Sequence, residues 1–285
     1  MQESGHQLPG RSHETATPPT RAREADLREW IATSQKRLDF WVSFVNGVRA
    51  RDVGEIGVYR GTFAERLLRD CSTISSYYMV DPWRHLDDWN KPANKADDLF
   101  EQLFHEAMDK TSAYAAKRIV LRGKTTEVIH QVPDEGLDFA YIDGDHTLRG
   151  VTIDLVKLFP KVKSGGWIGG DDFCRTIWQH EEGYEPTLVF PFAVYFAEAV
   201  DARIYGLPYN QFLIEKAEGD GYEFIDLTGN YRELELRGQL MREGAPRMRT
   251  PGSDVVKRGR AGHAAGRRRS FVARLRRRLR RRLTT

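Results

Sequence analysis

The chain is poor in cysteine: its 285 residues contain only Cys71 and Cys174. Two isolated cysteines cannot build a disulfide framework or a four-cysteine zinc site, so a reducing compartment is expected. Long apolar runs are also missing, and none approaches the roughly 20 residues that a membrane-spanning helix needs. The first 20 residues are polar and lack the apolar core of a secretory signal. We therefore expect a cytoplasmic protein.

The charges of the chain are distributed unevenly. Residues 251–285 contain thirteen lysines or arginines and one acid, Asp254, so they carry a net charge of about +12. Since the whole chain carries +3, residues 1–250 carry about −9. The sequence therefore predicts an acidic globular domain at residues 25–245, preceded by a disordered segment at 1–24 and followed by a basic tail at 246–285.

Apolar residues alternate between the spacing of strands and that of helices. We expect helices at 25–48, 62–70, 126–131 and 148–159, and strands at 53–56, 77–80, 119–121, 137–142 and 167–168, the last after a turn at 163–166. Two further strands, 202–206 and 211–215, predict a hairpin. This alternation favours an α/β fold: a Rossmann-like, doubly wound, mostly parallel sheet with an antiparallel hairpin at its C-terminal edge. Residues 84–116 hold no clear strand and are expected to form an inserted cap or lid.

Glycines and an acid follow the first two predicted strands. In a doubly wound sheet the carboxyl ends of the parallel strands open on one crevice, where ligands bind. The segment from Glu55 to Gly61 has glycines at a strand-to-helix turn, but it is not the G-x-G-x-x-G cradle of a pyrophosphate. Asp81 ends the next strand, where an acid accepts hydrogen bonds from ribose hydroxyls. Together they predict an adenosine-containing ligand without a diphosphate, although the loop alone also fits a turn that needs small residues.

Carboxylates also follow the strands at 137–142 and 167–168. Asp143, Asp171 and Asp172 are expected to converge, and three like charges repel unless a hard cation such as Mg²⁺ or Ca²⁺ holds them. Capping of turns or helices is the alternative for these aspartates, and for Asp172 in particular. Asp145 and His146 come next in the chain, where either can take a proton from a hydroxyl that the metal makes more acidic. For His146 the alternative is a surface position or a partner of the following helix. His180 is a weaker candidate.

Aromatic residues are dense between positions 175 and 196. Core packing explains most of them, because large apolar rings are usually buried. Only Trp178 and Tyr184 are expected to lie near a ligand.

Four segments, in their order and spacing, resemble a known family: E-I-G-V-x-x-G, V-D-P-W, L-D-F-A-Y-I-D-G-D-H and G-G-W-I-G-G-D-D-F. They are similar to class I S-adenosylmethionine-dependent methyltransferases. The resemblance is strongest to the metal-dependent small-molecule O-methyltransferases typified by macrocin and novobiocin-sugar O-methyltransferases. It covers about residues 50–215 and leaves out both tails.

The resemblance implies roles for individual residues. It places the methionine and ribose of S-adenosylmethionine beside Glu55, Gly57 and Gly61, and the ribose hydroxyls on Asp81. The whole implied cofactor set is Glu55, Gly57, Val58, Gly61, Asp81, Trp83, Gly123, Thr125 and Asp143. Asp143, Asp171 and Asp172 match the family's metal ligands, with Mg²⁺ as the expected ion, and Asp145 matches its general base. The implied reaction is methyl transfer to a hydroxyl of a small molecule, by preference a sugar or glycosylated natural product, with a phenolic or polyketide hydroxyl as the alternative.

Beyond this resemblance, residues 267–283 repeat leucine and phenylalanine every four positions among arginines. This pattern suits an anionic membrane surface, and nucleic acid is the rival because phosphate attraction needs only positive charge. A solvated tail without a partner is the third reading. A protein that acts only through this tail is the non-enzymatic alternative, which the acidity of residues 1–250 disfavours. The aromatic residues of 25–48 also raise the prospect of a homo-oligomer, although a helix that covers the core explains them as well.

Overall fold

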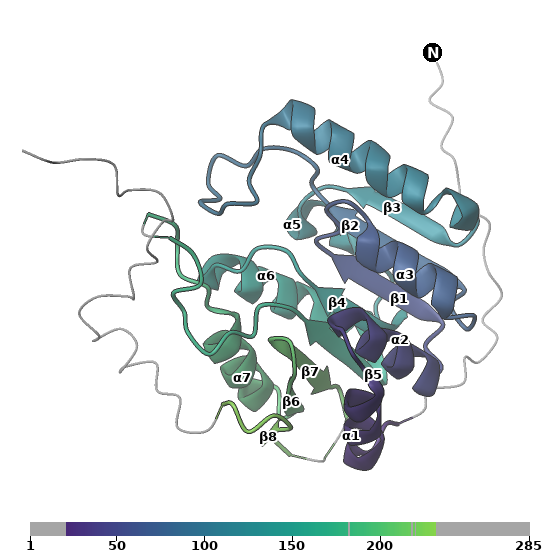
Figure 1. The fold of residues 1–285 in the computed structure, drawn as a ribbon, viewed down its shortest axis with the longest axis vertical. Helices are drawn as coiled ribbons and strands as arrows, with labels where there is room; N and C mark the ends of the chain where they lie inside the picture. Colours follow the sequence, from purple (N-terminus) through teal and green to yellow (C-terminus); the bar gives the residue numbers. More distant parts are fainter. Residues whose placement is uncertain (1–20, 182, 218, 220, 232–285) are drawn as a thin grey trace, which may run out of the picture. The chain divides into compact units, whose positions relative to one another are not determined.

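Eight strands form one sheet in the computed structural model, which describes residues 21–181, 183–217, 219 and 221–231 (Figure 1). The strands are β1 (Asp52–Ile56), β2 (Ser76–Asp81), β3 (Arg118–Arg122), β4 (Leu137–Ile142), β5 (Val162–Gly170), β6 (Arg203–Leu207), β7 (Gln211–Glu215) and β8 (Glu223–Asp226). They lie in the order β3-β2-β1-β4-β5-β7-β6-β8. All neighbours are parallel except the β5–β7 and β6–β7 pairs. The predicted fold class is confirmed.

Helices cover both faces of the sheet. They are α1 (Glu24–Thr33), α2 (Arg37–Gly47), α3 (Thr62–Asp70), α4 (Asp97–Lys110), α5 (Thr125–Val128), α6 (Leu148–Leu158) and α7 (Val189–Ala199). Three short 3₁₀ turns, Ser112–Tyr114, Ile129–Gln131 and Phe159–Lys161, join helices to strands. One core lies between the sheet and α1 to α4, and a second lies between the sheet and α5 to α7. Burial on both faces explains why β1, β2 and β4 are buried at almost every position rather than at alternate positions.

The direction of the strand order reverses between β1 and β4, and this reversal places the crevice. Backbone hydrogen bonds join the ends of the central strands: Gly57 N donates to Val80 O at 2.9 Å, and Asp143 N donates to Ile56 O at 2.7 Å. Asp171 N donates to Ile142 O at 2.9 Å. The segments after β1, β4 and β5 therefore start side by side at one edge of the sheet. Ligands of doubly wound proteins bind at this position.

The predicted single helix at 25–48 is wrong, because the chain breaks it into α1 and α2. Ser34 Oγ donates to Trp30 O at 2.6 Å and ends α1. Asp39 accepts from the backbone N–H of Lys36 at 3.1 Å, so this side chain satisfies a donor at the start of α2. Serine and aspartate bind nearby backbone groups in this way at helix ends. Apolar spacing continues across the break and therefore does not reveal it.

The sheet is longer than the sequence predicts. The expected turn at 163–166 and strand at 167–168 are one strand, β5, whose pairing with β4 shifts register between Leu137 and Phe139. Gly165 adopts φ +76° there, so the glycine pair marks an irregular strand rather than its end. The predicted hairpin is confirmed as β6 and β7, but the sheet continues beyond it to β8. Helix α7 was also not predicted, because it is apolar on nearly every side and shows no helical period.

Residues 84–116 divide into two parts. Helix α4 buries Phe100, Leu103 and Ala107 in the core beside α3. It is the ordinary crossover between β2 and β3, and the prediction of an inserted cap is wrong for this part. Residues 84–96 are irregular and keep the character of an insertion. The prediction of a disordered N-terminal segment at 1–24 is wrong for residues 21–24, since Ala22 is buried and Arg21 pairs with Glu215 at 2.8 Å.

Among the described helices, none has the length and apolar character that crossing a membrane requires. The tail segment 267–283 lies outside the described residues, so its expected membrane or nucleic-acid partner stays a prediction. The aromatic residues that raised the prospect of a homo-oligomer have partners within the chain: Trp41 and Phe44 are fully buried, and Trp30 packs edge-on against Phe44.

Trp41 ties α2 to the sheet, and its removal tests the first core. Its ring is fully buried, contacts Phe44, Phe139 and Tyr141, and donates through Nε1 to Gln211 Oε1 at 2.9 Å. Trp41→Ala should lower the free energy of unfolding by about 3–5 kcal/mol, because it leaves a large cavity and removes a donor. Urea unfolding measures this change. The exposed Val156 is the control, since Val156→Ala should change stability by less than about 0.5 kcal/mol; equal losses would contradict the assignment.

Candidate functional site

A cavity of about 690 Å³ opens at the carboxyl ends of β1, β2 and β4. The segments after β1 to β4 form its walls, and residues from Leu86 to Ala93 form a further side. This volume is typical of sites that hold a small molecule or cofactor. Of the residues singled out from the sequence, the wall contains Glu55, Gly57, Val58, Asp81, Gly123, Thr125, Asp143, Asp145, His146, Asp172 and His180. Gly61, Trp83, Asp171, Trp178 and Tyr184 are not part of it.

The turn after β1 needs its two glycines for different reasons. Gly57 has φ +90°, and a Cβ there would lie 2.1 Å from the backbone oxygen of Asp143. This glycine therefore lets the turns after β1 and β4 approach each other. Gly61 has φ +73°, and a Cβ would lie 2.9 Å from Cα of Ala107. Gly61 therefore packs against α4, while its neighbours Arg60 and Thr62 line the cavity. The cofactor contact that the resemblance implies for Gly61 stays a prediction.

Glu55 is a buried acid at the floor of the cavity. Its side chain accepts a hydrogen bond from the hydroxyl of Tyr77 at 2.7 Å. Burial nevertheless raises the pKa of Glu55 to about 8, because little water reaches the carboxylate. A cationic group bound in the cavity would favour the charged form of this acid, so Glu55 is placed to meet an ammonium or a sulfonium.

Asp81 organises the loop that faces it. Its carboxylate accepts from the backbone N–H of Tyr59 at 2.8 Å and of Trp83 at 2.7 Å. Burial raises the pKa of Asp81, and these two hydrogen bonds act in the opposite direction. Trp83 donates from Nε1 to the backbone oxygen of Tyr59 at 2.7 Å. Trp83 is fully buried, so it supports the glycine turn from behind and does not line the cavity.

Sequence reasoning missed Asp154, which lies on α6 and in the cavity wall. Thr125 donates to it at 2.6 Å, and burial raises the pKa of Asp154 to about 7. An acid on the otherwise apolar inner face of a predicted helix was the signal that could have found it. With Gly123 and Thr125, it forms the end of the cavity that follows β3.

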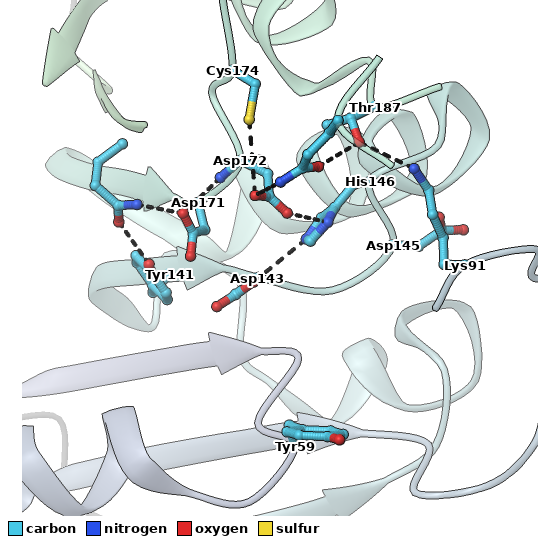
Figure 2. A network of polar contacts seen from close by, with 12 residues as sticks. Tyr59, Lys91, Tyr141, Asp143, Asp145, His146, Asp171, Asp172, Cys174 and Thr187 are labelled. Carbon is cyan, nitrogen blue, oxygen red and sulfur yellow. Dashed lines mark hydrogen bonds and ion pairs between the residues drawn. The ribbon is translucent and has the colours of Figure 1, made fainter. Parts of the chain in front are cut away.

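In the same cavity, Asp143, His146 and Asp172 face one another (Figure 2). His146 Nδ1 pairs with Asp172, and His146 Nε2 lies 3.4 Å from Asp143 Oδ1. Among the described residues, this is the group whose donor atoms, all within 4.8 Å of one another, are arranged to hold a metal ion. Apart from its 3.4 Å approach to Asp143, the buried Nε2 atom has no hydrogen-bond partner among the described residues. One nitrogen and two carboxylate oxygens suit a divalent cation.

The charges of this group are balanced within the chain. Burial lowers the pKa of His146, but the two aspartates outweigh burial and raise it to about 9. Burial acts to raise the pKa of Asp172, yet the hydrogen bonds from His146 and Gln179 leave it below its ordinary value. Near pH 7 an imidazolium between two carboxylates is therefore the stable state of the chain by itself. A cation that binds here must displace this proton.

The structure does not bring Asp171 into this group, contrary to the predicted ligand set of Asp143, Asp171 and Asp172. Asp171 pairs with Arg37 of α2 and accepts from the amide of Gln211. Asp172 has φ +56°, and this turn of the backbone sends the two neighbouring carboxylates to different partners (Figure 2). His146 is the third member of the group in place of Asp171. Arg37 was not predicted; its guanidinium also lies 3.5 Å from Asp143 and lines the cavity.

Asp145, a predicted catalytic residue, lines the cavity beside this group. One of its oxygens accepts from the backbone N–H of Thr147 at 2.9 Å. A Cβ at Gly150 would lie 2.1 Å from Cγ of Asp145, so α6 leaves room for this carboxylate. His146, the other predicted catalytic residue, has both ring nitrogens directed at aspartates and therefore fits a ligand better than a proton acceptor. His180 lines the cavity, whereas Trp178 and Tyr184 are partly exposed outside the wall.

Glu55 gives the site a dependence of stability on pH. Its pKa moves from 4.5 to about 8 on folding, so between these values the folded chain holds a proton that the unfolded chain has released. The free energy of unfolding should therefore fall as pH rises from about 5 to about 8. Glu55→Gln should remove this fall, with a gain over the wild type on the order of a few kcal/mol at pH 8. Urea unfolding of both proteins from pH 5 to pH 8 measures this gain. A difference in the free energy of unfolding that does not vary with pH would contradict the raised pKa of Glu55.

Comparisons with known proteins agree with this geometry. Residues 55–173 match the family model described as a methyltransferase domain. A search of the curated proteins finds no match to the chain. Among solved structures, a proposed caffeoyl-CoA O-methyltransferase from Staphylococcus aureus is 13% identical, with a TM-score of 0.50, over 67% of this chain and 87% of that one. At this identity the likeness is one of fold.

Two further structures have lower TM-scores. An O-methyltransferase from Bacillus cereus in complex with SAH is 16% identical, over 68% of this chain and 91% of that one, with a TM-score of 0.48. TomG from Streptomyces achromogenes, in complex with SAM, is 13% identical, over 68% and 90%, with a TM-score of 0.46. The family match begins at the acid of the glycine turn and ends just after the two aspartates that follow β5. Residues 55–173 therefore match a methyltransferase domain, in agreement with the resemblance seen in the sequence.

Proposed function

We propose that the protein transfers the methyl group of S-adenosylmethionine to a hydroxyl oxygen of a small molecule, with a divalent cation bound at Asp143, His146 and Asp172. The observation that carries this proposal is one cavity lined by two chemically distinct sets of residues. The first set is the glycine turn, Glu55 and Asp81, and the second is the aspartate–histidine group. A transferase needs both, because donor and acceptor must meet in one site.

S-adenosylmethionine fits the first set of residues by its chemistry. Asp81 is placed to accept hydrogen bonds from the ribose hydroxyls, and Glu55 to face the positive charge of the methionine part. Gly57 lets the ligand approach the backbone of the turn, beside Val58. Gly123, Thr125 and Asp154 are left for the adenine ring. This assignment keeps the predicted cofactor residues that line the cavity and omits Gly61 and Trp83, which support the turn from outside it.

Oxygen is the acceptor atom that the aspartate–histidine group suits best. A divalent cation at Asp143, His146 and Asp172 would lower the pKa of a nearby hydroxyl. Asp145 lines the same cavity and is the proposed base that receives the hydroxyl proton. The acceptor O–CH₃ bond forms as the S–CH₃ bond breaks, which yields a methyl ether and S-adenosylhomocysteine. Charge placement and orientation of the two reactants then supply most of the rate enhancement.

The donor atoms bear on the choice of cation. Mg²⁺ prefers oxygen ligands, whereas an imidazole nitrogen suits transition metals such as Mn²⁺ or Zn²⁺. We therefore extend the predicted Mg²⁺ to Mn²⁺ as the better match for a site with one nitrogen and two oxygens. The alternative is a protonated His146 without a cation, since an imidazolium balances the same two carboxylates.

For the acceptor we propose a sugar or glycosylated natural product, with a phenolic or polyketide hydroxyl as the alternative. Leu86, Trp89 and Pro92 give the cavity an apolar side, against which the C–H face of a sugar or the face of an aromatic ring can pack. A screen of both acceptor classes with a labelled methyl donor separates them. Label in phenols but not in sugars would overturn the sugar assignment alone.

The metal part of the proposal is tested at Asp172. Asp172→Ala should weaken Mn²⁺ binding by about 100-fold or more, because it removes a ligand, and should change S-adenosylmethionine affinity by less than about threefold. Calorimetric titration with each ligand measures both affinities. Asp134→Ala, at a surface acid paired with Lys161, is the matched control and should bind both like the wild type. Unchanged turnover after treatment with a chelator would contradict the metal site.

The proposed base is tested at Asp145. Asp145→Asn should slow methyl transfer in a single turnover by about 10²–10⁴-fold, because the amide cannot take the hydroxyl proton. Binding of Mn²⁺ and S-adenosylmethionine should persist, which separates loss of the base from loss of the site. A variant with the rate and the pH profile of the wild type would exclude Asp145 as the base.

A further inference from the structure

A continuous chain of side chains connects residues 84–96 to the aspartate–histidine group. Lys91 Nζ donates to Thr187 Oγ1 at 3.1 Å, and Thr187 Oγ1 donates to Gln179 Oε1 at 2.6 Å. Gln179 Nε2 donates to Asp172 Oδ1 at 2.6 Å, and Asp172 pairs in turn with His146. Figure 2 shows this chain from Lys91 to His146. Of these residues, Gln179, Thr187 and Lys91 carry no role in the function proposed above.

The ammonium group determines the direction of every hydrogen bond in this chain. Lysine can only donate, so Thr187 accepts from it and must direct its own proton elsewhere. The acceptor of that proton is Gln179 Oε1, and the amide NH₂ of Gln179 is thereby left to face Asp172. The orientation of the Gln179 amide thus depends on a charge two hydrogen bonds away.

Gln179 in turn determines which oxygen of Asp172 is free. Its NH₂ occupies Oδ1, and Oδ2 is left to face His146. Asp172 has a left-handed backbone that positions it apart from Asp171, so its carboxylate needs a partner that stops it from rotating. The next segment is held as well, because Leu188 N donates to the backbone oxygen of His146 at 2.9 Å.

Lys91 also fastens the segment that covers one side of the cavity. The other protons of Nζ go to the backbone oxygens of Glu185 at 2.8 Å and Pro186 at 3.2 Å. The adjacent Asn90 donates to Gly183 O at 2.7 Å. Lys91 is only 4% exposed and forms no ion pair with a carboxylate among the described residues. Burial lowers its pKa, while the charges of Asp145 and Asp172 act to raise it. A buried cation without a direct counter-ion is costly and indicates a specific role.

We propose that Gln179 is a positioning residue for Asp172, and that Lys91 and Thr187 orient it, so that fastening residues 84–96 over the cavity and aligning Asp172 are one coupled event. This inference rests on the proposed function for the identity of the cation. The coupling itself depends only on contacts within the chain and needs no bound metal. It means that the aspartate–histidine group is fully aligned when residues 84–96 are in place.

Thr187→Val, Gln179→Leu and Lys91→Met, made in the full chain, test this proposal. Each should weaken Mn²⁺ binding by about 10-fold, the size of effect expected from a residue that orients a ligand. Affinity for S-adenosylmethionine should change by less than about threefold. Thr187→Ser keeps the hydroxyl and should bind Mn²⁺ like the wild type. Gln131→Leu, the same change at an exposed glutamine, is the control for Gln179→Leu.

Amide hydrogen exchange of residues 84–96 is the second measurement, and it needs no metal. Gln179→Leu should speed this exchange, because the hydrogen-bonded path from Gln179 reaches Lys91 through Thr187, and Gln131→Leu should not. Wild-type Mn²⁺ affinity in Gln179→Leu, or unchanged exchange, would overturn the proposal. If the wild type binds S-adenosylmethionine but no Mn²⁺, the metal part of the proposed function fails, and the exchange result alone decides the coupling.

Discussion

Repulsion among carboxylates at the ends of β4 and β5 is the constraint around which the rest of the site is built. Asp143, Asp171 and Asp172 follow neighbouring strands, so their like charges repel unless cationic groups lie between them. The chain supplies two: His146 between Asp143 and Asp172, and Arg37 between Asp143 and Asp171. Arg37 comes from the first turn of α2, so the N-terminal helices do more than cover the sheet. A bound cation at Asp143, His146 and Asp172 would take over the charge balance that the imidazolium now provides.

The two sets of residues that line the cavity are positioned in different ways. Around the glycine turn, backbone groups do much of the positioning: Gly57 allows two turns to approach, and Asp81 is held by two N–H groups. Around the aspartate–histidine group, side chains that follow β4 and β5 and side chains of the segment 179–187 hold one another. This group therefore depends on several distant parts of the chain.

Much of the fold and part of the site could be predicted from the sequence. The strands were predictable because buried parallel strands are short apolar runs followed by glycine or acid, as at Glu55 to Gly61. The break between α1 and α2 was not, since it depends on hydrogen bonds of Ser34 and Asp39 that leave the apolar spacing intact. Helix α7 was missed because burial on most sides removes its period. Asp171 and Asp172 could not be told apart, because which of two adjacent carboxylates faces the cavity depends on one backbone angle.

The sequence by itself determined which residue types come to the edge of the sheet, because strand ends are encoded by local pattern and parallel strands end together. It determined the methyltransferase fold and the presence of acid beside glycine turns. Only the tertiary structure decided that His146 rather than Asp171 completes the aspartate–histidine group, and that Arg37 lies beside Asp143. It also decided the chain from Lys91 through Thr187 and Gln179 to Asp172. These choices follow from the side-chain directions of residues far apart in the chain, and no local pattern contains that information.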